Sequence, residues 1–297
     1  MASSPSFTAE TMALQRSFES HRPPAQRLFS DPFADAFLRP RLRMLAVASG
    51  VPVLRRLVTG VYDAIGGPGP RPSAILRTRV IDDALRDASP ALGQCVLLGA
   101  GYDTRAHRLA ALAGMQVFEV DRPVTQQAKR AIVDRLGLTS DHVTYVAIDF
   151  ERDDLSSRLV AAGFDRTVPT TFLWEGVTQY LTGAAVDSTL SAVRGLAGGG
   201  GVLTMTYVDA RALGAASPFP EARRWVRAVA RAGEPWTFGL LPGDVPAFFA
   251  DRGFVLVRDL STLDAGRQLS RSERPRLAGS ALYRVTVAEI AGAARLP

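Results

Sequence analysis

Two glycines and a carboxylate in the first half of the chain could bind a nucleoside. Gly99 and Gly101 form a turn between an apolar stretch and a helical one, and Asp121 ends the next apolar stretch. A glycine turn that opens a helix, followed about 20 residues later by a carboxylate at a strand end, is typical of a βαβ unit that holds a nucleoside. The sequence therefore predicts an adenosine derivative as the ligand.

The residues after the turn separate two kinds of nucleoside ligand. A dinucleotide site prefers a third glycine, because helix and strand must pack closely beneath the pyrophosphate. Here Thr104 takes that position, and Asp103 precedes it. A carboxylate there repels a pyrophosphate but suits a ligand with an ammonium group and no phosphate, such as S-adenosylmethionine (SAM). The alternatives are a nicotinamide cofactor and a purely structural turn in which Asp103 caps the helix.

An arginine stands on the apolar face of a predicted helix over residues 74–88. At 100° per residue, Arg77 falls at the centre of the apolar arc, whereas Arg79, Asp82 and Arg86 fall on the polar side. A guanidinium on a buried face needs an anionic partner, because an unpaired buried charge is costly. That partner could be the carboxylate of SAM, held by both arms of the guanidinium, or an acidic side chain of the protein.

Two further carboxylates follow predicted strands. Asp149, with Phe150 beside it, ends one strand and could accept a hydrogen bond from an adenine amino group, and Glu175 ends the next. In an open α/β sheet the ligand lies beyond the carboxyl ends of the strands, so both carboxylates should face the same crevice as Gly99 and Asp121. Several acidic groups around one crevice suit a ligand with a cation and hydroxyls, although each could instead cap a helix.

Alternating strands and helices must position these residues. From residue 94 onward the chain alternates strand and helix, which predicts a mostly parallel sheet covered on both faces. The last two strands look like a closing antiparallel pair, which favours an α/β, Rossmann-like, seven-stranded class I methyltransferase sheet over the six parallel strands of a dehydrogenase. Four buried strands are expected, at 94–100, 116–120, 143–148 and 170–175. The later strands are expected at Val202–Val208, Phe254–Leu260 and Ala281–Val287, with helices near 221–232 and 243–252.

We expect one structural unit with two additions to the sheet. Residues 1–90 should form a helical N-terminal cap on a core of residues 91–297, and residues from about 209 to 241 should form an inserted lid. Aromatic side chains of this lid either line a pocket or, more in keeping with their usual role, fill its interior. They are Trp225, Trp236 and Phe238.

Charge and composition limit the partners. The net charge of +6 comes from 35 basic residues, of which Lys129 is the only lysine, and they are scattered among acidic residues. Because no basic stripe is present, no nucleic-acid partner is expected. The three histidines lie far apart, so no metal site is expected either.

Neither a targeting signal nor a membrane span is expected. Met1–Glu10 lacks the pattern of a signal peptide, and no stretch reaches the roughly 18 apolar residues of a span. Met44–Leu54 is apolar but short, so we expect it to be buried in the cap. The single Cys95 favours a reducing compartment and a buried structural thiol. A cytoplasmic protein without a membrane partner is expected, and the oligomeric state is left open.

Four segments of the chain form a recognisable set. They are RTRVID at 77–82, GAGYDTR at 99–105, FEVDRP at 118–123 and WEGVTQYL at 174–181. Together they resemble the leucine carboxyl methyltransferase family, in particular its bacterial small-molecule branch. The N-terminal segments 8–10, 19–23 and 28–32 are similar to that branch as well, so the resemblance covers most of residues 8–182.

The resemblance implies that SAM is the cofactor and S-adenosylhomocysteine its product. It also implies a role for five residues. Arg77 would hold the SAM carboxylate, Gly99 would line the methionine, Asp121 would bind the ribose hydroxyls, Asp149 would lie by the adenine, and Glu175 would contact the methionine end. Gly101, Asp103 and Phe150 are the other residues expected to bind the cofactor.

The methyl acceptor is the least determined part. The enzyme mainly needs to hold a nucleophile in line with the methyl group and exclude water. Tyr180 could orient an acceptor, His107 should pack against the sheet, and no convincing general base is found. A carboxylate needs no base at neutral pH, so the leading hypothesis is an O-methyltransferase acting on a small carboxylate of secondary metabolism. Transfer to a hydroxyl or amine, a nicotinamide-dependent oxidoreductase and a non-catalytic SAM-binding protein are the alternatives.

Overall fold

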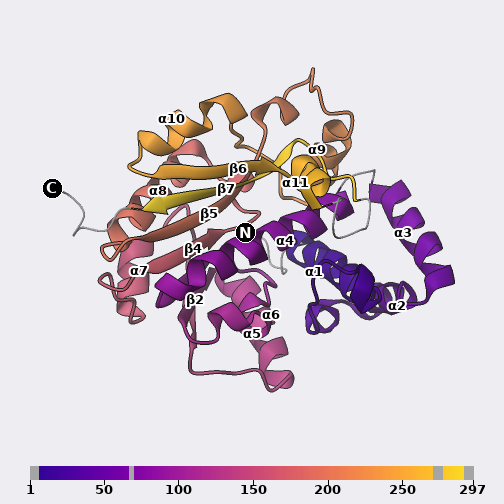
Figure 1. Cartoon of the computed structure of the whole chain (residues 1–297), viewed down its shortest axis with the longest axis horizontal. Helices are drawn as coiled ribbons and strands as arrows, with labels where there is room; N and C mark the ends of the chain where they lie inside the picture. The colour runs from indigo at the N-terminus through magenta and orange to yellow at the C-terminus, as the bar shows by residue number, and fades with distance from the viewer. Residues whose placement is uncertain (1–6, 67–69, 270–276, 291–297) are drawn as a thin grey trace.

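A seven-stranded mixed sheet forms the centre of the molecule (Figure 1). The computed structural model describes residues 7–66, 70–269 and 277–290. The strand order is β3-β2-β1-β4-β5-β7-β6, in which β1 to β5 run parallel and β7 is antiparallel to both of its neighbours. This confirms the predicted class I methyltransferase sheet. The strands are β1 (Gln94–Leu98), β2 (Gln116–Asp121), β3 (Val143–Ala147), β4 (Thr170–Trp174), β5 (Gly201–Val208), β6 (Val255–Ser261) and β7 (Tyr283–Ile290).

Burial along the strands follows their place in the sheet. Every residue of the central strands β1 and β4 is buried, as expected for parallel strands covered on both faces. The prediction that β3 is a buried strand is wrong, because only Val146 of its five residues is buried. β3 lies at one edge of the sheet and β6 at the other, so each has a neighbouring strand on one side only.

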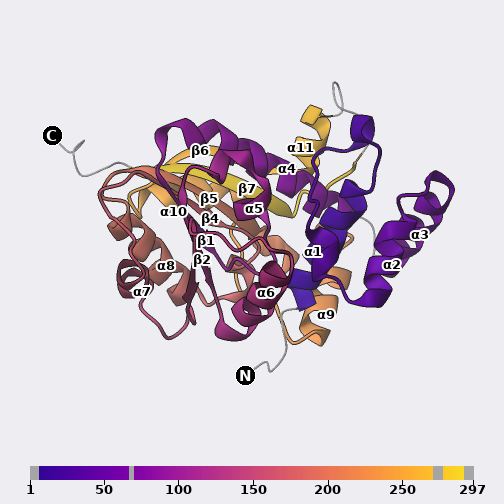
Figure 2. The ribbon, with the colours of Figure 1, turned by 90° about the horizontal axis from the view of Figure 1, so that it is seen from below.

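Helices cover both faces of the sheet (Figures 1 and 2). Side chains of α7, α8 and α10 pack with one face, and side chains of α4, α5 and α11 pack with the other. The helices are α1 (Phe7–Ser20), α2 (Pro40–Ala48), α3 (Pro52–Gly66), α4 (Pro70–Ala88), α5 (Arg105–Arg108), α6 (Pro123–Arg135), α7 (Leu155–Ala161), α8 (Gly183–Leu196), α9 (Ala222–Arg231), α10 (Val245–Ala250) and α11 (Thr262–Leu269). Short 3-10 helices are η1 (Pro24–Gln26), η2 (Ala34–Phe37), η3 (Ser89–Ala91), η4 (Ala110–Leu112), η5 (Thr178–Tyr180), η6 (Ala210–Ala212) and η7 (Pro242–Asp244).

The first three helices lie beside the sheet, with α2 and α3 farthest from it (Figures 1 and 2). The prediction that Met44–Leu54 is buried is wrong. Ala46 and Ser49 are buried, but Met44 is 67% exposed and Val53 is 83% exposed. Most large apolar side chains of this segment lie on the outward face of α2 and α3 rather than in the interior of the cap.

The segment predicted as a lid folds next to the carboxyl end of β5. It contains η6 and α9, and a bridge between Asp209 and Leu240 joins its two ends. Trp225 and Trp236 are buried against Tyr283, and Phe238 packs on Phe248. These aromatic side chains therefore fill the interior, which was the favoured of the two interpretations. Among the described residues, none of the helices has the length and apolar character needed to cross a bilayer.

Candidate functional site

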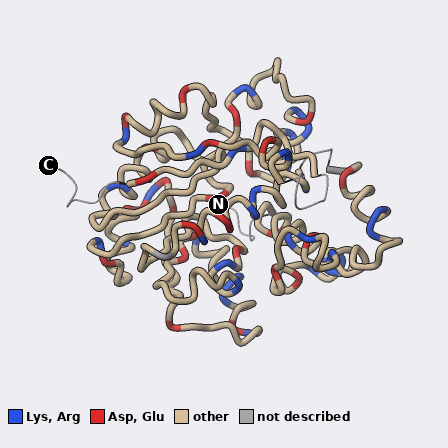
Figure 3. The backbone as a smooth tube through the Cα atoms, viewed as in Figure 1, with Lys and Arg blue, Asp and Glu red and all other residues tan. Residues whose placement is uncertain are grey.

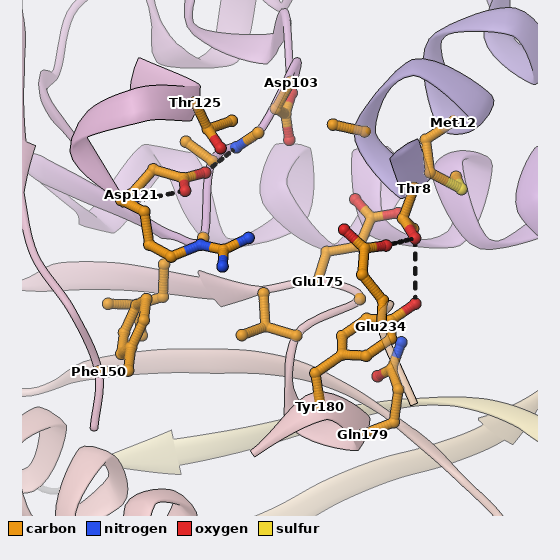
Figure 4. A pocket seen from close by; sticks show the side chains of 18 of the residues that line it. Thr8, Met12, Asp103, Asp121, Thr125, Phe150, Glu175, Gln179, Tyr180 and Glu234 are labelled. Carbon is orange, nitrogen blue, oxygen red and sulfur yellow. Dashed lines mark hydrogen bonds between the residues drawn. The ribbon is translucent and has the colours of Figure 1, made fainter. Parts of the chain in front are cut away.

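A cavity of about 390 Å³ opens at the carboxyl ends of β1, β2 and β4 (Figure 4). Its volume falls in the range of about 300–1,000 Å³ that is usual for small-molecule sites. All nine predicted site residues line it, although they come from six separate stretches of the chain. They are Arg77, Gly99, Gly101, Asp103, Asp121, Asp149, Phe150, Glu175 and Tyr180.

The glycine turn after β1 forms one wall of the cavity. Gly99 has a φ of +71°, and a Cβ atom there would lie 2.3 Å from Cγ2 of Val177, so a larger residue would collide with the segment after β4. Gly101 has a φ of +46°, and its backbone N–H donates to Oδ2 of Asp121 at 2.5 Å. The turn therefore packs closely against the segment after β4, and it is held by the carboxylate that ends β2.

Asp121 is fixed by backbone groups rather than by a cation. Besides the N–H of Gly101, its other oxygen accepts a hydrogen bond from the N–H of Arg122 at 2.6 Å. Burial raises the pKa of Asp121 above its usual value, and these two backbone donors act against that increase. The carboxylate keeps further lone pairs, which could accept hydrogen bonds from ribose hydroxyls in the cavity.

A buried network of charges lies beside the glycine turn. Arg77 donates from Nε to Oε1 of Glu175 at 2.7 Å, so this arginine does have an acidic side chain as a partner. Arg105 donates from Nη1 to Oε2 of Glu175 at 2.6 Å and to Oδ2 of Asp103 at 2.5 Å, and from Nε to Oδ1 of Asp82 at 2.7 Å. Arg105 thus connects three carboxylates and is 2% exposed.

This network corrects the predicted position of Asp82. The prediction that Asp82 lies on the polar side of the helix is wrong, because its side chain is fully buried and pairs with Arg105 and Arg108. α4 packs against the sheet, α1 and α11, so a single polar stripe does not describe it. On the side of α4 that the 100° spacing predicts to be polar, other parts of the protein cover Asp82 in place of water.

The pKa values of the network follow from this pairing. Burial alone would raise the pKa of Asp82, Asp103 and Glu175, but the guanidinium of Arg105 lowers all three below their usual values. Burial works against the charge of Arg105 as well, yet the surrounding carboxylates raise its pKa. All four groups are therefore ionised at neutral pH, and Asp103 is less able to repel a phosphate than its place in the sequence suggests.

The turn after β3 closes the other end of the cavity. Oδ1 of Asp149 accepts a hydrogen bond from the N–H of Glu151 at 3.1 Å, and its own N–H donates to Asp153. The Asp149 side chain is 44% exposed, and Phe150 beside it is partly buried against the core. Phe150 therefore presents its ring at the cavity wall (Figure 4), and Asp149 lines the same part of the wall.

Three distant segments meet at the opposite end, near Tyr180. Oη of Tyr180, in η5, lies 3.4 Å from Oγ1 of Thr8 on α1. The Thr8 hydroxyl donates to Oε2 of Glu234, in the segment after α9 (Figure 4). Gln179 also lines this part of the cavity, and its Oε1 atom is buried without a hydrogen-bond partner. Such an atom can accept a hydrogen bond from a bound molecule.

Sequence reasoning missed several of these residues. Arg105 stands directly after the glycine turn, and its position two residues after Asp103 was the available signal. Thr8 and Glu234 are 226 residues apart and belong to no chemical motif, so nothing in the sequence joined them. Their proximity comes from the packing of α1 beside the segment after α9.

Three other ionisable groups lie outside the cavity wall. Glu119 pairs with Lys129 at 2.6 Å, and both side chains are almost completely buried. Burial lowers the pKa of His107 to about 4, and this side chain does not line the cavity. In the described part of the chain, no three His, Cys, Asp or Glu side chains form a cluster suited to a metal ion.

The cavity fits SAM in charge and in shape. Gly99 and Gly101 bring backbone without a side chain to the cavity wall, and Asp121 is suited to hydroxyl groups. Arg77 supplies a cation at the end where Glu175 lies, and the orphaned Gln179 oxygen indicates a missing polar partner. A zwitterionic nucleoside matches this arrangement of charges better than a diphosphate does.

Comparison with known proteins gives a consistent result. The leucine carboxyl methyltransferase family matches residues 9–194. A proposed SAM-dependent methyltransferase of Mycolicibacterium gilvum (strain PYR-GCK) is 36% identical over 223 residues, which cover 72% of this chain and 70% of that protein. A second, from Mycobacterium sp. (strain JLS), is 37% identical over 222 residues, covering 70% of this chain and 68% of that protein.

A solved structure supports the fold. The crystal structure of a proposed methyltransferase from Thermobifida fusca YX superposes with a TM-score of 0.60 at 20% identity, covering 97% of this chain and 96% of that one. The match spans all seven strands and the helices around them. The family match argues against the nicotinamide-dependent alternative. The chain belongs to the leucine carboxyl methyltransferase family, and it is a SAM-dependent methyltransferase.

Proposed function

We propose that this methyltransferase transfers the methyl group of SAM to a hydroxyl oxygen of a small, uncharged molecule. The observation that carries the proposal is the contact of Thr8 with both Tyr180 and Glu234 at one end of the cavity. A carboxylate linked to two hydroxyl groups can accept the proton that a hydroxyl acceptor must lose. The volume of the cavity, about 390 Å³, suits a small-molecule acceptor.

We assign a role to each cofactor-binding residue from its position in the wall of the cavity. Arg77 holds the SAM carboxylate, and Glu175 lies at the same end because the two side chains pair. Asp121 accepts hydrogen bonds from the ribose hydroxyls, and Asp149 with Phe150 flanks the adenine. Gly99, Gly101 and Asp103 line the methionine part of the cofactor.

The residues around Tyr180 would orient the acceptor and remove its proton. SAM supplies a methyl group that is already activated by its sulfonium. Tyr180 and Gln179 hold the acceptor through hydrogen bonds, and Glu234 takes the hydroxyl proton, directly or through Thr8. Aligning the acceptor oxygen and excluding water account for most of the expected rate enhancement.

Charge near Tyr180 makes the carboxylate acceptor suggested by the sequence the weaker choice. Three arginines line the cavity, and two of them already donate to acidic side chains: Arg16 to Asp31, and Arg77 to Glu175. Arg122 follows Asp121, at the far end. Among the described residues of the cavity wall, no arginine without an acidic partner lies at the Tyr180 end. An anionic acceptor beside Glu234 would therefore meet like charge, whereas a neutral hydroxyl would not.

The division of the chain also enters the proposal. We propose that residues 1–90 act as a cap and residues from about 209 to 241 as a lid over the core of residues 91–297. The support is that α1 contributes Thr8 and the lid contributes Glu234 to the same end of the cavity. Closing these two segments over the acceptor would exclude water from it.

A substrate screen tests the proposal. The enzyme and SAM are incubated with matched sets of small alcohols, phenols, amines and carboxylic acids, and products that gain one methyl group are sought by mass spectrometry. We expect turnover with hydroxyl compounds, and loss of that turnover in the variant Glu234→Gln, which cannot accept the proton. Turnover with carboxylic acids alone would contradict the proposal, and cofactor binding in calorimetry without any product would favour a non-catalytic SAM-binding protein.

A further inference from the structure

We infer that α2 and α3 form a surface that docks on an anionic lipid bilayer. This surface, called the α2–α3 face below, consists of the exposed side chains of residues 39–61. Eight of the fourteen large apolar side chains found exposed among the described residues belong to it. They are Met44, Leu45, Val47, Val51, Val53, Leu54, Leu57 and Val61.

The orientation of α3 is opposite to that of a normal surface helix. At 100° per residue, Val53, Leu57 and Val61 lie within one 80° arc, and they are 83%, 64% and 51% exposed. The other side of the helix faces the protein, where Val58 and Tyr62 pack with α1. An amphipathic helix that turns its apolar side away from its own protein needs an apolar environment there.

The charge around these apolar side chains has a single sign. Residues 36–62 contain five arginines and no aspartate or glutamate. Arg39 pairs with Glu10, and Arg55 donates to backbone oxygens of Ser49 and Gly50. Exposed arginines beside apolar side chains are the combination that binds anionic headgroups while the apolar groups enter the acyl region.

The chemistry of this face favours lipid over the other occupants. A second copy of the chain would bring two arginine-rich, carboxylate-free faces together, and their repulsion would oppose pairing. A nucleic acid would satisfy the arginines but would leave the apolar side chains in water. An anionic bilayer satisfies both, so it replaces the sequence-based expectation that the chain has no membrane partner.

The α2–α3 face is linked to the proposed lid. Arg224 of α9 donates from Nη2 to the backbone oxygen of Ala64 near the end of α3 at 2.5 Å. The segment that follows α9 carries Glu234 into the cavity. Figure 2 shows α2 and α3 on the side of α1 that faces away from the sheet, where a flat surface can approach them.

Vesicle binding tests this inference with the full chain. The protein is sedimented with two kinds of vesicle. One is phosphatidylcholine alone, and the other contains about 30% phosphatidylglycerol, which gives the surface a substantial negative charge. We expect binding to the anionic vesicles only, and at least a tenfold loss of partitioning in the double variant Val53→Glu/Leu57→Glu. Arg43→Glu/Arg56→Glu should reduce it by about fivefold or more per arginine, and raised salt should weaken binding in the wild type.

A matched control separates this face from general surface hydrophobicity. Val160→Glu/Val257→Glu changes two exposed apolar residues of α7 and β6, and it should bind vesicles like the wild type. Calorimetry with S-adenosylhomocysteine and thermal unfolding check that every variant is folded. Equal loss of binding in Val53→Glu/Leu57→Glu and in the control Val160→Glu/Val257→Glu would overturn the inference. So would a wild type that does not bind the anionic vesicles. A wild-type dimer in light scattering that Val53→Glu/Leu57→Glu makes monomeric would overturn it in favour of a second copy.

Discussion

The two ends of the cavity are built in different ways. The cofactor end consists of residues that follow consecutive strands, and a buried arginine, Arg105, ties three of its carboxylates together. The acceptor end brings together Thr8, Tyr180 and Glu234 from α1, η5 and the segment after α9. One end is fixed by the sheet, whereas the other depends on how two added segments pack.

Figure 3 shows the same difference in the distribution of charge. Acidic and basic residues lie close together near the centre of the molecule, where β1, β2 and β4 end, whereas basic residues dominate along α2 (Figure 3). Opposite charges that are buried together are rigid and costly to separate. Such an arrangement suits a site that must hold one constant cofactor, and a less constrained acceptor end allows specificity to vary.

The largest effect should come from breaking the charge network at the cofactor end. Replacing Arg105 with methionine leaves the carboxylates of Asp82, Asp103 and Glu175 without their shared partner. We expect a loss of about 3–5 kcal/mol in the free energy of unfolding, measured in urea. Arg158→Met, which removes an exposed pair with Asp153, is the control and should cost less than about 0.5 kcal/mol. Equal losses would show that the network does not stabilise the fold.

The next effect concerns catalysis at the acceptor end. Glu234→Gln keeps the size of the side chain but removes its ability to accept a proton. With a hydroxyl acceptor we expect kcat to fall by about 100-fold or more, while the affinity for S-adenosylhomocysteine changes less than about twofold. Thr8→Val should give a smaller loss of kcat if the proton passes through its hydroxyl. A change in cofactor affinity equal to the change in kcat would contradict the separation of the two ends.

A smaller effect is expected on cofactor binding from Arg77. Arg77→Ala removes the proposed partner of the SAM carboxylate, and we expect the Kd for SAM in calorimetry to rise by about 10- to 100-fold. Arg79→Ala serves as the control on the same helix, because Arg79 donates to Asp83 and to the oxygen of Leu28 and does not line the cavity. Equal effects of the two substitutions would mean that Arg77 is only a structural partner of Glu175.

Acid should produce the smallest and most gradual change. The pKa values of Asp82, Asp103 and Glu175 are lowered in the folded protein, so their stabilisation is present above the ordinary carboxyl pKa and is lost as the pH falls below about 4. The difference in unfolding free energy between the wild type and Arg105→Met should therefore be constant from pH 7 to 5 and then shrink. A difference that does not depend on pH would indicate that Arg105 acts through packing.

Much of the fold and of the cofactor end could be predicted from the sequence. Each strand that was expected is present within a few residues, and the antiparallel last pair identified the class of sheet. Gly99, Asp121 and Glu175 line one cavity because parallel strands place their carboxyl ends at one edge. The local sequence pattern was sufficient here, because a motif that directly follows a parallel strand must lie at the carboxyl edge of the sheet.

Tertiary packing decided what local pattern could not. Asp82 is buried because α4 is covered on several sides, and Met44–Leu54 is exposed because α2 and α3 turn their apolar side chains outward. Glu234 reaches Thr8, 226 residues away in the sequence, only because the segment after α9 packs beside α1. The sequence by itself determined the sheet, the glycine turn and the residues at its strand ends, because these depend on short-range periodicity and turn chemistry. The acceptor end and the α2–α3 face depend on contacts between distant segments, which no short-range pattern specifies.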